Sequence, residues 1–287
     1  MEIILGRYSG FCNGVKNTVN KANELLNNNG TMYSLGDIVH NEVVINNLEK
    51  KGLIVKNHLD DIPDNSKVII RAHGEPIEIY QKAKKKNIEI FDLTCGKVKL
   101  IHNKILNKKN SFVIVIGKKN HPETIAHKSY SNNSFVIENI NEVNEAYISY
   151  KSSNKDNVYI VAQTTFNNLL FDEIVDEIKR VFISIPIDVD KTICNATSIR
   201  QEEARELSRK VDKMIIIGGR NSSNTKELEM VSRDYCKNVY LIQTKDDLIK
   251  EMFSENDIIG ITAGASTPNE VIEDVVRFLD SFYIKKK

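Results

Sequence analysis

Short runs rich in Ile, Val, Tyr and Phe alternate along the whole chain with longer stretches in which apolar residues recur among Lys and Glu. The short runs have the length and composition of buried strands, and the longer stretches have the spacing of amphipathic helices. The runs that we interpret as strands are EIILG, KVIIRA, IEIFDL, SFVIVIG, VYIVAQ, KMIIIGG, VYLIQ and DIIGITAG. Such alternation is typical of βαβ units with right-handed crossovers, so the sequence predicts an α/β fold with parallel sheets.

Three of the four cysteines, Cys12, Cys95 and Cys194, stand at the same place in this pattern, where a predicted helix begins. They divide the chain into stretches of similar length, which indicates an internal repeat. We therefore predict three similar α/β domains. Their predicted ranges are 1–95, 96–193 and 194–287.

Polar residues gather in the turns that follow other predicted strands, two such turns in each third of the chain. In open parallel sheets ligands bind outside the carboxyl ends of the strands, so these turns would form one central pocket if the three domains face one another. Each turn alone also has a structural explanation, because Gly, Asn, Ser and Thr end strands and cap helices. The residues are His40, His73, His121, Glu123, Thr164, Thr165, Ser222, Ser223, Asn224 and Ser266.

The charge balance and the hydropathy exclude several classes of protein. With 40 Lys and Arg against 39 Asp and Glu, no overall basic field favours nucleic acid or an anionic membrane surface. No apolar run approaches the roughly 20 residues that a membrane span needs, and the first residues do not resemble a secretory signal. We expect a cytoplasmic protein without a nucleic-acid or membrane partner.

The cysteines are too few for a disulfide scaffold in a chain of 287 residues. A thiolate at a helix N-terminus is stabilised by the exposed backbone N–H groups, so three such thiols together favour a soft cation. Zinc usually takes four ligands and often shows local CxxC or HxxxH pairs, neither of which occurs. An iron-sulfur cluster held by three thiolates would have one open iron, able to supply electrons and to bind a hydroxyl oxygen. Cys236 precedes a predicted strand and is interpreted as a packing residue.

The histidines, serines and asparagine of the polar turns form a donor-rich set that suits a phosphate or diphosphate. Neither a Walker loop nor a GxGxxG motif is present, so the usual nucleotide cradle is not indicated. Glu123 is the one carboxylate in these turns and is the natural proton source. From the residues alone, we predict reductive chemistry on a small phosphorylated alcohol.

Nine short motifs, taken in order, resemble the family of 4-hydroxy-3-methylbut-2-enyl diphosphate reductases, which perform the last step of the non-mevalonate isoprenoid pathway. They are GFCNGV, VHN, AHG, TC, HPE, QTT, ICNAT, NSSN and TAGAS, and they cover almost the whole chain. The resemblance implies three α/β domains with small parallel sheets in a pseudo-threefold arrangement around a central site. It also implies a 4Fe-4S cluster with three cysteine ligands, Cys12, Cys95 and Cys194, and one open iron.

The resemblance implies a reaction and a set of roles as well. The allylic diphosphate substrate would undergo reductive dehydroxylation to isopentenyl and dimethylallyl diphosphates, with electrons from a ferredoxin- or flavodoxin-like donor. Glu123 would deliver a proton, with Thr164 in the hydrogen-bond path. The substrate-binding residues would be His40, His73, His121, Thr164, Ser222, Ser223, Asn224 and Ser266.

The chain departs from the family pattern at two places. Gly96 follows the second cysteine where Pro is common, and Ser198 and Ile199 follow CNAT where Thr-Asn is usual. We expect activity to survive, because Pro at a first helical position mainly presets φ. Two other hypotheses stay open: a zinc hydrolase with three cysteines, and a non-catalytic protein that binds a phosphorylated ligand and whose thiols are merely packed.

Overall fold

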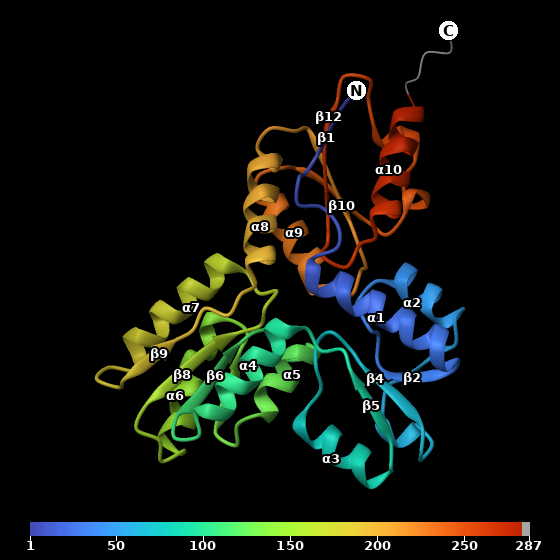
Figure 1. Cartoon of the computed structure of the whole chain (residues 1–287). Coiled ribbons are helices and arrows are strands. Elements are labelled where there is room, and N and C mark those ends of the chain that lie inside the picture. Colours follow the sequence, from blue (N-terminus) through green and yellow to red (C-terminus); the bar gives the residue numbers. More distant parts are fainter. Residues whose placement is uncertain (283–287) are drawn as a thin grey trace. The chain divides into compact units, whose positions relative to one another are not determined.

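The strands follow the hydrophobic runs of the sequence. The computed structural model of the chain describes residues 1–282, and all eight predicted strands form there (Figure 1). They are β1 (Glu2–Leu5), β4 (Lys67–Ile70), β5 (Glu89–Asp92), β6 (Phe112–Ile116), β8 (Val158–Ala162), β10 (Lys213–Ile217), β11 (Asn238–Ile242) and β12 (Ile258–Ala263). Four further strands lie outside the predicted runs: β2 (Met32–Leu35), β3 (Leu53–Lys56), β7 (Ser134–Ile137) and β9 (Ile187–Val189).

Each of the three predicted helices that follow a cysteine is present. They are α1 (Asn13–Asn29), α4 (Gly96–Asn107) and α8 (Asn195–Ser208). The other helices of the described chain are α2 (Glu42–Glu49), α3 (Ile77–Lys85), α5 (Pro122–Ser129), α6 (Val143–Lys151), α7 (Asn168–Val181), α9 (Ser223–Arg233) and α10 (Asn269–Ser281). Within residues 1–282, none of these helices is both long enough and apolar enough to cross a membrane.

The strands pair in three parallel four-stranded sheets, which confirms the predicted α/β class. The orders are β3-β2-β4-β5, β7-β6-β8-β9 and β11-β10-β12-β1. The three sheets share one strand order. The first strand after a cysteine helix (β2, β6 or β10) is central, and the next strand (β3, β7 or β11) lies at one edge. The strand that leads into a cysteine (β5, β9 or β1) lies at the other edge. The internal repeat inferred from the cysteines is therefore a repeat of sheet topology.

Strand β1 lies in a different sheet from the one that the predicted domain range 1–95 gives it. It pairs with β12, with Glu2 opposite Ile258 and Leu5 opposite Ile261, and not with β2–β5. The physical reason is that each sheet takes as its edge strand the strand that precedes a cysteine. For the sheet of β10–β12 this strand is β1, which precedes Cys12. The last repeat needs it to cover the open edge of β12, whose N–H and C=O groups would otherwise be unpaired. The boundaries near residues 95 and 193 stay predictions.

By its internal contacts the chain forms two compact units. The first contains Met1–Asn17, Val39–Asn47 and the residues from Asn195 on, with the sheet of β1, β10, β11 and β12. The second contains Thr18–Ile38 and Leu48–Cys194, with the other two sheets.

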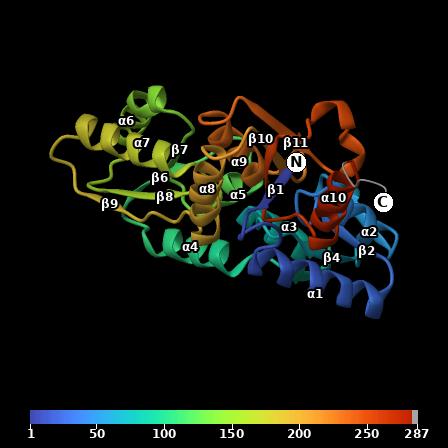
Figure 2. The ribbon, with the colours of Figure 1, turned by 90° about the horizontal axis from the view of Figure 1, so that it is seen from above.

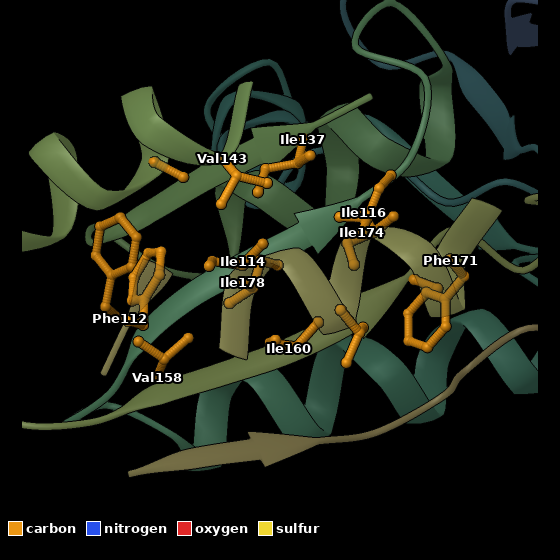
Figure 3. Packing of buried hydrophobic residues seen from close by; sticks show 14 of the residues in the cluster. Phe112, Ile114, Ile116, Ile137, Val143, Val158, Ile160, Phe171, Ile174 and Ile178 are labelled. Atoms are coloured by element: carbon orange, nitrogen blue, oxygen red, sulfur yellow. The ribbon is translucent and has the colours of Figure 1, made fainter. Parts of the chain in front are cut away.

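The sheet of β6–β9 in the second unit is covered on both faces. Helices α6 and α7 lie on one side and α4 on the other (Figure 2). On the α7 side, Phe112 and Ile114 of β6 pack with Ile174 and Ile178 of α7 (Figure 3). Because a strand buried on both faces has no polar side, β6 and β8 are continuous apolar runs. This rigid layer carries at its edge the turns that hold the candidate site.

Candidate active site

The three cysteines that open helices share one local structure. Each lies directly before α1, α4 or α8, and each donates its backbone N–H to the carbonyl two residues beyond the end of a neighbouring strand. The three hydrogen bonds are Cys12 to Ala265 at 3.1 Å, Cys95 to Ala72 at 3.0 Å and Cys194 to Thr164 at 2.9 Å. These three cysteines are partly exposed and in no disulfide, whereas Cys236 is buried, which confirms its interpretation as a packing residue.

The loop before Cys12 is fixed by helix α8 within the first unit. The Cys12 Sγ accepts the N–H of Val15 at 3.4 Å, as a capping side chain does. Arg200 of α8 donates a hydrogen bond of 2.7 Å to the Gly10 carbonyl, and Glu203 accepts the N–H groups of Arg7 and Tyr8. Arg200 and Glu203 were not predicted from the sequence, because in an amphipathic helix they resemble any charged pair on its polar face.

Gly10 is required by the shape of the same loop. Its φ is +89°, and an added Cβ would lie 2.7 Å from the Asn269 side-chain oxygen. A residue with a side chain would therefore be both strained and obstructed there. The sulfur of Cys12 is thus presented by a turn with little freedom.

The polar residues predicted in the first unit lie at the carboxyl ends of β10 and β12. Ser266, after β12, donates its hydroxyl to the His40 carbonyl at 3.1 Å. Gly219, after β10, approaches the same carbonyl so closely that an added Cβ would lie 2.4 Å from its oxygen. These contacts bring His40 to the turn that contains Ser222, Ser223 and Asn224.

Ser222 and Asn224 differ in how their side chains are used. Ser222 caps α9, since its hydroxyl accepts the N–H of Thr225 at 3.3 Å, so its structural explanation holds. Asn224 is 3% exposed, and neither its oxygen nor its nitrogen has a hydrogen-bond partner within residues 1–282. A buried amide without a partner is costly, so this side chain is the stronger candidate for a ligand contact.

In the second unit His73 and His121 form an edge-to-face pair, with ring centroids 5.3 Å apart. His121 caps α5, and its Nδ1 accepts the N–H of Glu123 at 3.2 Å, which leaves Nε2 as the donor of the neutral ring. Burial lowers the pKa of His121 to about 4. At neutral pH His121 is therefore an uncharged donor, which suits an anion.

Glu123 is buried and held by three hydrogen bonds. Its two oxygens accept the backbone N–H of Thr164 at 2.6 Å and the Thr164 hydroxyl at 2.8 Å. The Nε2 of His127 lies 3.2 Å from Oε1. Thr165, in contrast, accepts a hydrogen bond from the Gln163 side chain at 2.7 Å.

These contacts determine the charge of Glu123. Burial raises the pKa of the carboxyl, but the hydrogen bond from His127, the electrostatic effect of the His127 and His121 imidazoles, and the N–H of Thr164 outweigh burial. The pKa of Glu123 is therefore below its ordinary value, and the group is a carboxylate at neutral pH. Its partner His127 was not predicted, although a His four residues after a Glu lies on the same helix face.

The predicted site residues thus fall into two groups. The first unit brings together Cys12, His40, Ser222, Ser223, Asn224 and Ser266, and the second contains Cys95, Cys194, His73, His121, Glu123 and Thr164. A single pocket built from both groups stays a prediction. The sulfurs suit a soft metal centre, because all three cysteines are outside disulfides and stand at helix N-termini whose main chain is tethered to a sheet.

A family model described as LytB protein matches residues 3–280. A 4-hydroxy-3-methylbut-2-enyl diphosphate reductase of Clostridioides difficile is 40% identical over 284 residues, which cover 98% of this chain and 100% of the relative. One of Aquifex aeolicus with the same name is 39% identical over 282 residues, 96% of this chain and 94% of the relative.

Two solved structures are also similar. The E-1-hydroxy-2-methyl-but-2-enyl-4-diphosphate reductase from Plasmodium falciparum has a TM-score of 0.88 and 31% identity, over 97% of this chain and 87% of that one. An (E)-4-hydroxy-3-methyl-but-2-enyl diphosphate reductase, the terminal enzyme of the non-mevalonate pathway, has a TM-score of 0.68 and 38% identity, over 98% and 99%.

Proposed function

The chain belongs to the LytB family, and we propose that it reduces 4-hydroxy-3-methylbut-2-enyl diphosphate, with loss of the hydroxyl group, to isopentenyl and dimethylallyl diphosphates. This is the last step of the non-mevalonate isoprenoid pathway. The observation that carries the proposal is the threefold repetition of one structure, a partly exposed cysteine that opens a helix and is tethered beyond a neighbouring strand. No packing role explains such a repetition.

Cys12, Cys95 and Cys194 would hold a 4Fe-4S cluster with one open iron. Their chemistry fits, because thiolates are the usual ligands of such clusters and a helix N-terminus favours the thiolate form. When bound, the cluster supplies the electrons and the Lewis-acidic iron that removal of a hydroxyl group requires. The electrons would come from a ferredoxin- or flavodoxin-like donor. Partly exposed cysteines that form no disulfide suit a reducing compartment, so we place the protein in the cytoplasm.

The diphosphate would be bound by uncharged donors from both units. Asn224 supports this role, since its buried amide has no hydrogen-bond partner in the described chain. His121 supports it too, because its Nδ1 accepts the N–H of Glu123, so the proton of the neutral ring is on Nε2. The other proposed contacts are His40, His73, Thr164, Ser222, Ser223 and Ser266.

Glu123 and Thr164 would handle the proton that leaves with the hydroxyl group as water. Glu123 is a carboxylate in the ligand-free chain, so it must first take up a proton. The negative charge of a bound diphosphate raises the pKa of a nearby carboxyl, because like charges disfavour its ionised form. Protonated Glu123 would then donate, with the Thr164 hydroxyl 2.8 Å away to orient it. The carbon atom that receives the final proton decides which of the two products forms.

The proposal is tested by turnover under exclusion of oxygen. The protein is given 4-hydroxy-3-methylbut-2-enyl diphosphate and a chemically reduced viologen, and the products are identified by mass spectrometry and NMR. We expect both isomeric diphosphates. Inorganic diphosphate as the only product, or unchanged substrate, would contradict the proposal.

Replacing Glu123 by Gln separates binding from chemistry. We expect kcat to fall about 100-fold or more and KM to change little, because proton delivery matters in the chemical step. Glu142, an acid on the short helical turn before α6, gives the matched control E142Q, which should keep its turnover. A Glu123→Gln protein with normal kcat would remove this residue from its proposed role.

A further inference from the structure

Two buried histidines that the proposed reaction does not use lie behind Glu123. His127 of α5 is fully buried, and His102 of α4 is 4% exposed. Their rings pack edge to face, with centroids 5.0 Å apart. Buried histidines are uncommon unless their ring nitrogens are hydrogen-bonded, so each nitrogen needs an account.

One ring nitrogen of each histidine is enclosed and without a partner within residues 1–282. They are Nδ1 of His127 and Nε2 of His102. The other nitrogen of His127, Nε2, already faces Oε1 of Glu123 at 3.2 Å. A direct hydrogen bond of about 3 Å between two imidazole nitrogens corresponds to ring centroids about 5 Å apart, which is the separation of these two rings.

His102 connects this pair to the surface. Its ring stacks on that of Tyr130, with centroids 4.0 Å apart and an angle of 12° between the planes. It also lines a surface cavity of about 290 Å³ whose other polar walls are Tyr80, Asp92, Lys99 and Asn103. The His102 ring thus lies between the solvent in this cavity and the buried His127.

We infer that His127 and His102 form a proton path that recharges Glu123 from the surface cavity. The inference rests on the proposed role of Glu123 as the proton donor. In each cycle Glu123 loses its proton to the departing hydroxyl group. The carboxylate then takes the proton of His127 Nε2, His127 Nδ1 takes that of His102 Nε2, and His102 takes one from an acid in the cavity. One proton enters, and no electrons move.

The surroundings of the two rings favour proton transfer through neutral imidazoles and disfavour a permanently protonated His102. Burial, with the nearby His127, lowers the pKa of His102 to about 3, while Glu123 and Asp92 raise it and Lys99 lowers it. The groups that face His127 are Glu123 and His121 of its own turn and helix, and His102 of α4. His102 is therefore neutral at neutral pH, so it can pass a proton from one nitrogen to the other without storing it.

The path also explains how a buried carboxylate can act more than once. Glu123 is 2% exposed, and its other polar neighbours are the main chain and hydroxyl of Thr164 and the cap His121. The Thr164 hydroxyl donates to it at 2.8 Å. A proton that reaches Glu123 through His127 of α5 and His102 of α4 does not have to pass through the substrate-binding side of the site.

The test uses His127→Gln and His102→Gln. A Gln at position 127 can still donate a hydrogen bond to Glu123, so the position of the Glu123 carboxylate is kept. It cannot relay a proton, so proton transfer from His102 to Glu123 is lost. With a reduced viologen in excess, we expect kcat of each variant to fall about tenfold or more with KM within about twofold, and the loss to grow with pH. Added imidazole, a small acid that fits the cavity, should restore part of the rate. The matched control is His58→Gln, an exposed histidine of the same unit.

The double variant distinguishes a path from two separate structural effects. Because both histidines act in one series, the double variant should be no slower than the slower single variant, whereas independent effects multiply. Single variants that keep turnover within about twofold of the wild type at every pH would overturn the inference. So would a double variant whose loss equals the product of the two single losses.

A measurement without turnover keeps the inference separate from the proposed function. Wild-type protein that reduces no substrate contradicts the proposed function, but the coupling of Glu123 to His127 can still be followed by ¹³C NMR of the Glu123 carboxyl carbon, assigned with Glu123→Gln. We expect this carbon to titrate in two steps in the wild type and in one step in His127→Gln. Identical titrations in the two proteins would overturn the path.

Discussion

Asn224 and Ser222 show that two residues of one motif can use their side chains differently. The Asn224 amide is buried and has no hydrogen-bond partner within the described chain. The hydroxyl of the nearby Ser222, in contrast, caps α9. Both lie in the motif NSSN, and the sequence predicts the same role for both. The difference depends on where each side chain points, which no pattern of residue types records.

Replacing Asn224 by Ala should therefore weaken binding and leave the fold intact. We expect the affinity for inorganic diphosphate to fall about 10-fold to 100-fold, since hydrogen bonds to a charged group contribute about 1.5–3 kcal/mol. The free energy of unfolding should stay the same or rise, because an unsatisfied amide is removed. Ser222→Ala is the control and should lose about 1 kcal/mol of stability as a lost cap. Calorimetric titration and chemical denaturation measure both, and a destabilised Asn224→Ala would contradict the assignment.

Buried histidines also set the response of the fold to acid. The pKa of His121 falls from 6.5 to about 4 on folding, chiefly through burial, so the unfolded chain binds more protons than the folded chain between these values. Stability should therefore decrease as the pH falls from about 6.5 towards 4. For His121 the loss is about 3 kcal/mol at most, and His102 adds to it in the same direction.

Urea denaturation at pH 7 and pH 4.5 measures this loss. His121→Gln should reduce the difference between the two pH values, because Gln carries no proton to take up. Equal stability of the wild type at both pH values would show that these rings are not buried in neutral form.

At the scale of elements, the sequence predicted eight strands, among them the short edge strands β1 and β5, and missed β2, β3, β7 and β9. β3, β7 and β9 are edge strands of three or four residues, so they need no continuous apolar run. β2 is central but contains Ser34, a buried hydroxyl that donates to the Gly36 carbonyl. The helices after the cysteines were predicted because capping and amphipathic spacing are local.

Helix α4 begins with Gly96, and the structure also has room for Pro at this position. No atom lies within 4 Å of a Cβ added at Gly96, and Cys95 before it has φ −53° and ψ 135°, which a following Pro allows. We expect Gly96→Pro to stabilise the protein by about 0.4–1 kcal/mol, because it restricts the unfolded chain.

The control for this substitution is Gly74→Ala. Gly74 has φ +75°, and an added Cβ would lie 2.8 Å from the His102 ring, so this variant should be destabilised. Thermal unfolding of both variants measures the effects. A lower melting temperature for Gly96→Pro would show that the start of α4 needs the freedom of glycine.

At the scale of the molecule, the chain repeats one sheet topology three times, and β1 belongs to the sheet of the last repeat. The N-terminal strand completes the sheet of the last repeat, so ranges drawn by counting from the first residue separate β1 from its partners. Cysteine spacing reveals the repeat, since it is a property of the sequence. The pairing of β1 with β12 depends on contacts between residues more than 250 positions apart, which local patterns do not contain.

The central claim is that three equivalent thiols from the three repeats hold one iron-sulfur cluster. Iron and sulfide analysis with a visible spectrum, on protein purified without oxygen, tests it most directly. We expect about four irons and four sulfides per chain in the wild type, the same in Cys236→Ser, and loss of the brown colour in a Ser variant of Cys12, Cys95 or Cys194. Colourless wild-type protein, or one that contains zinc and no sulfide, would contradict the account.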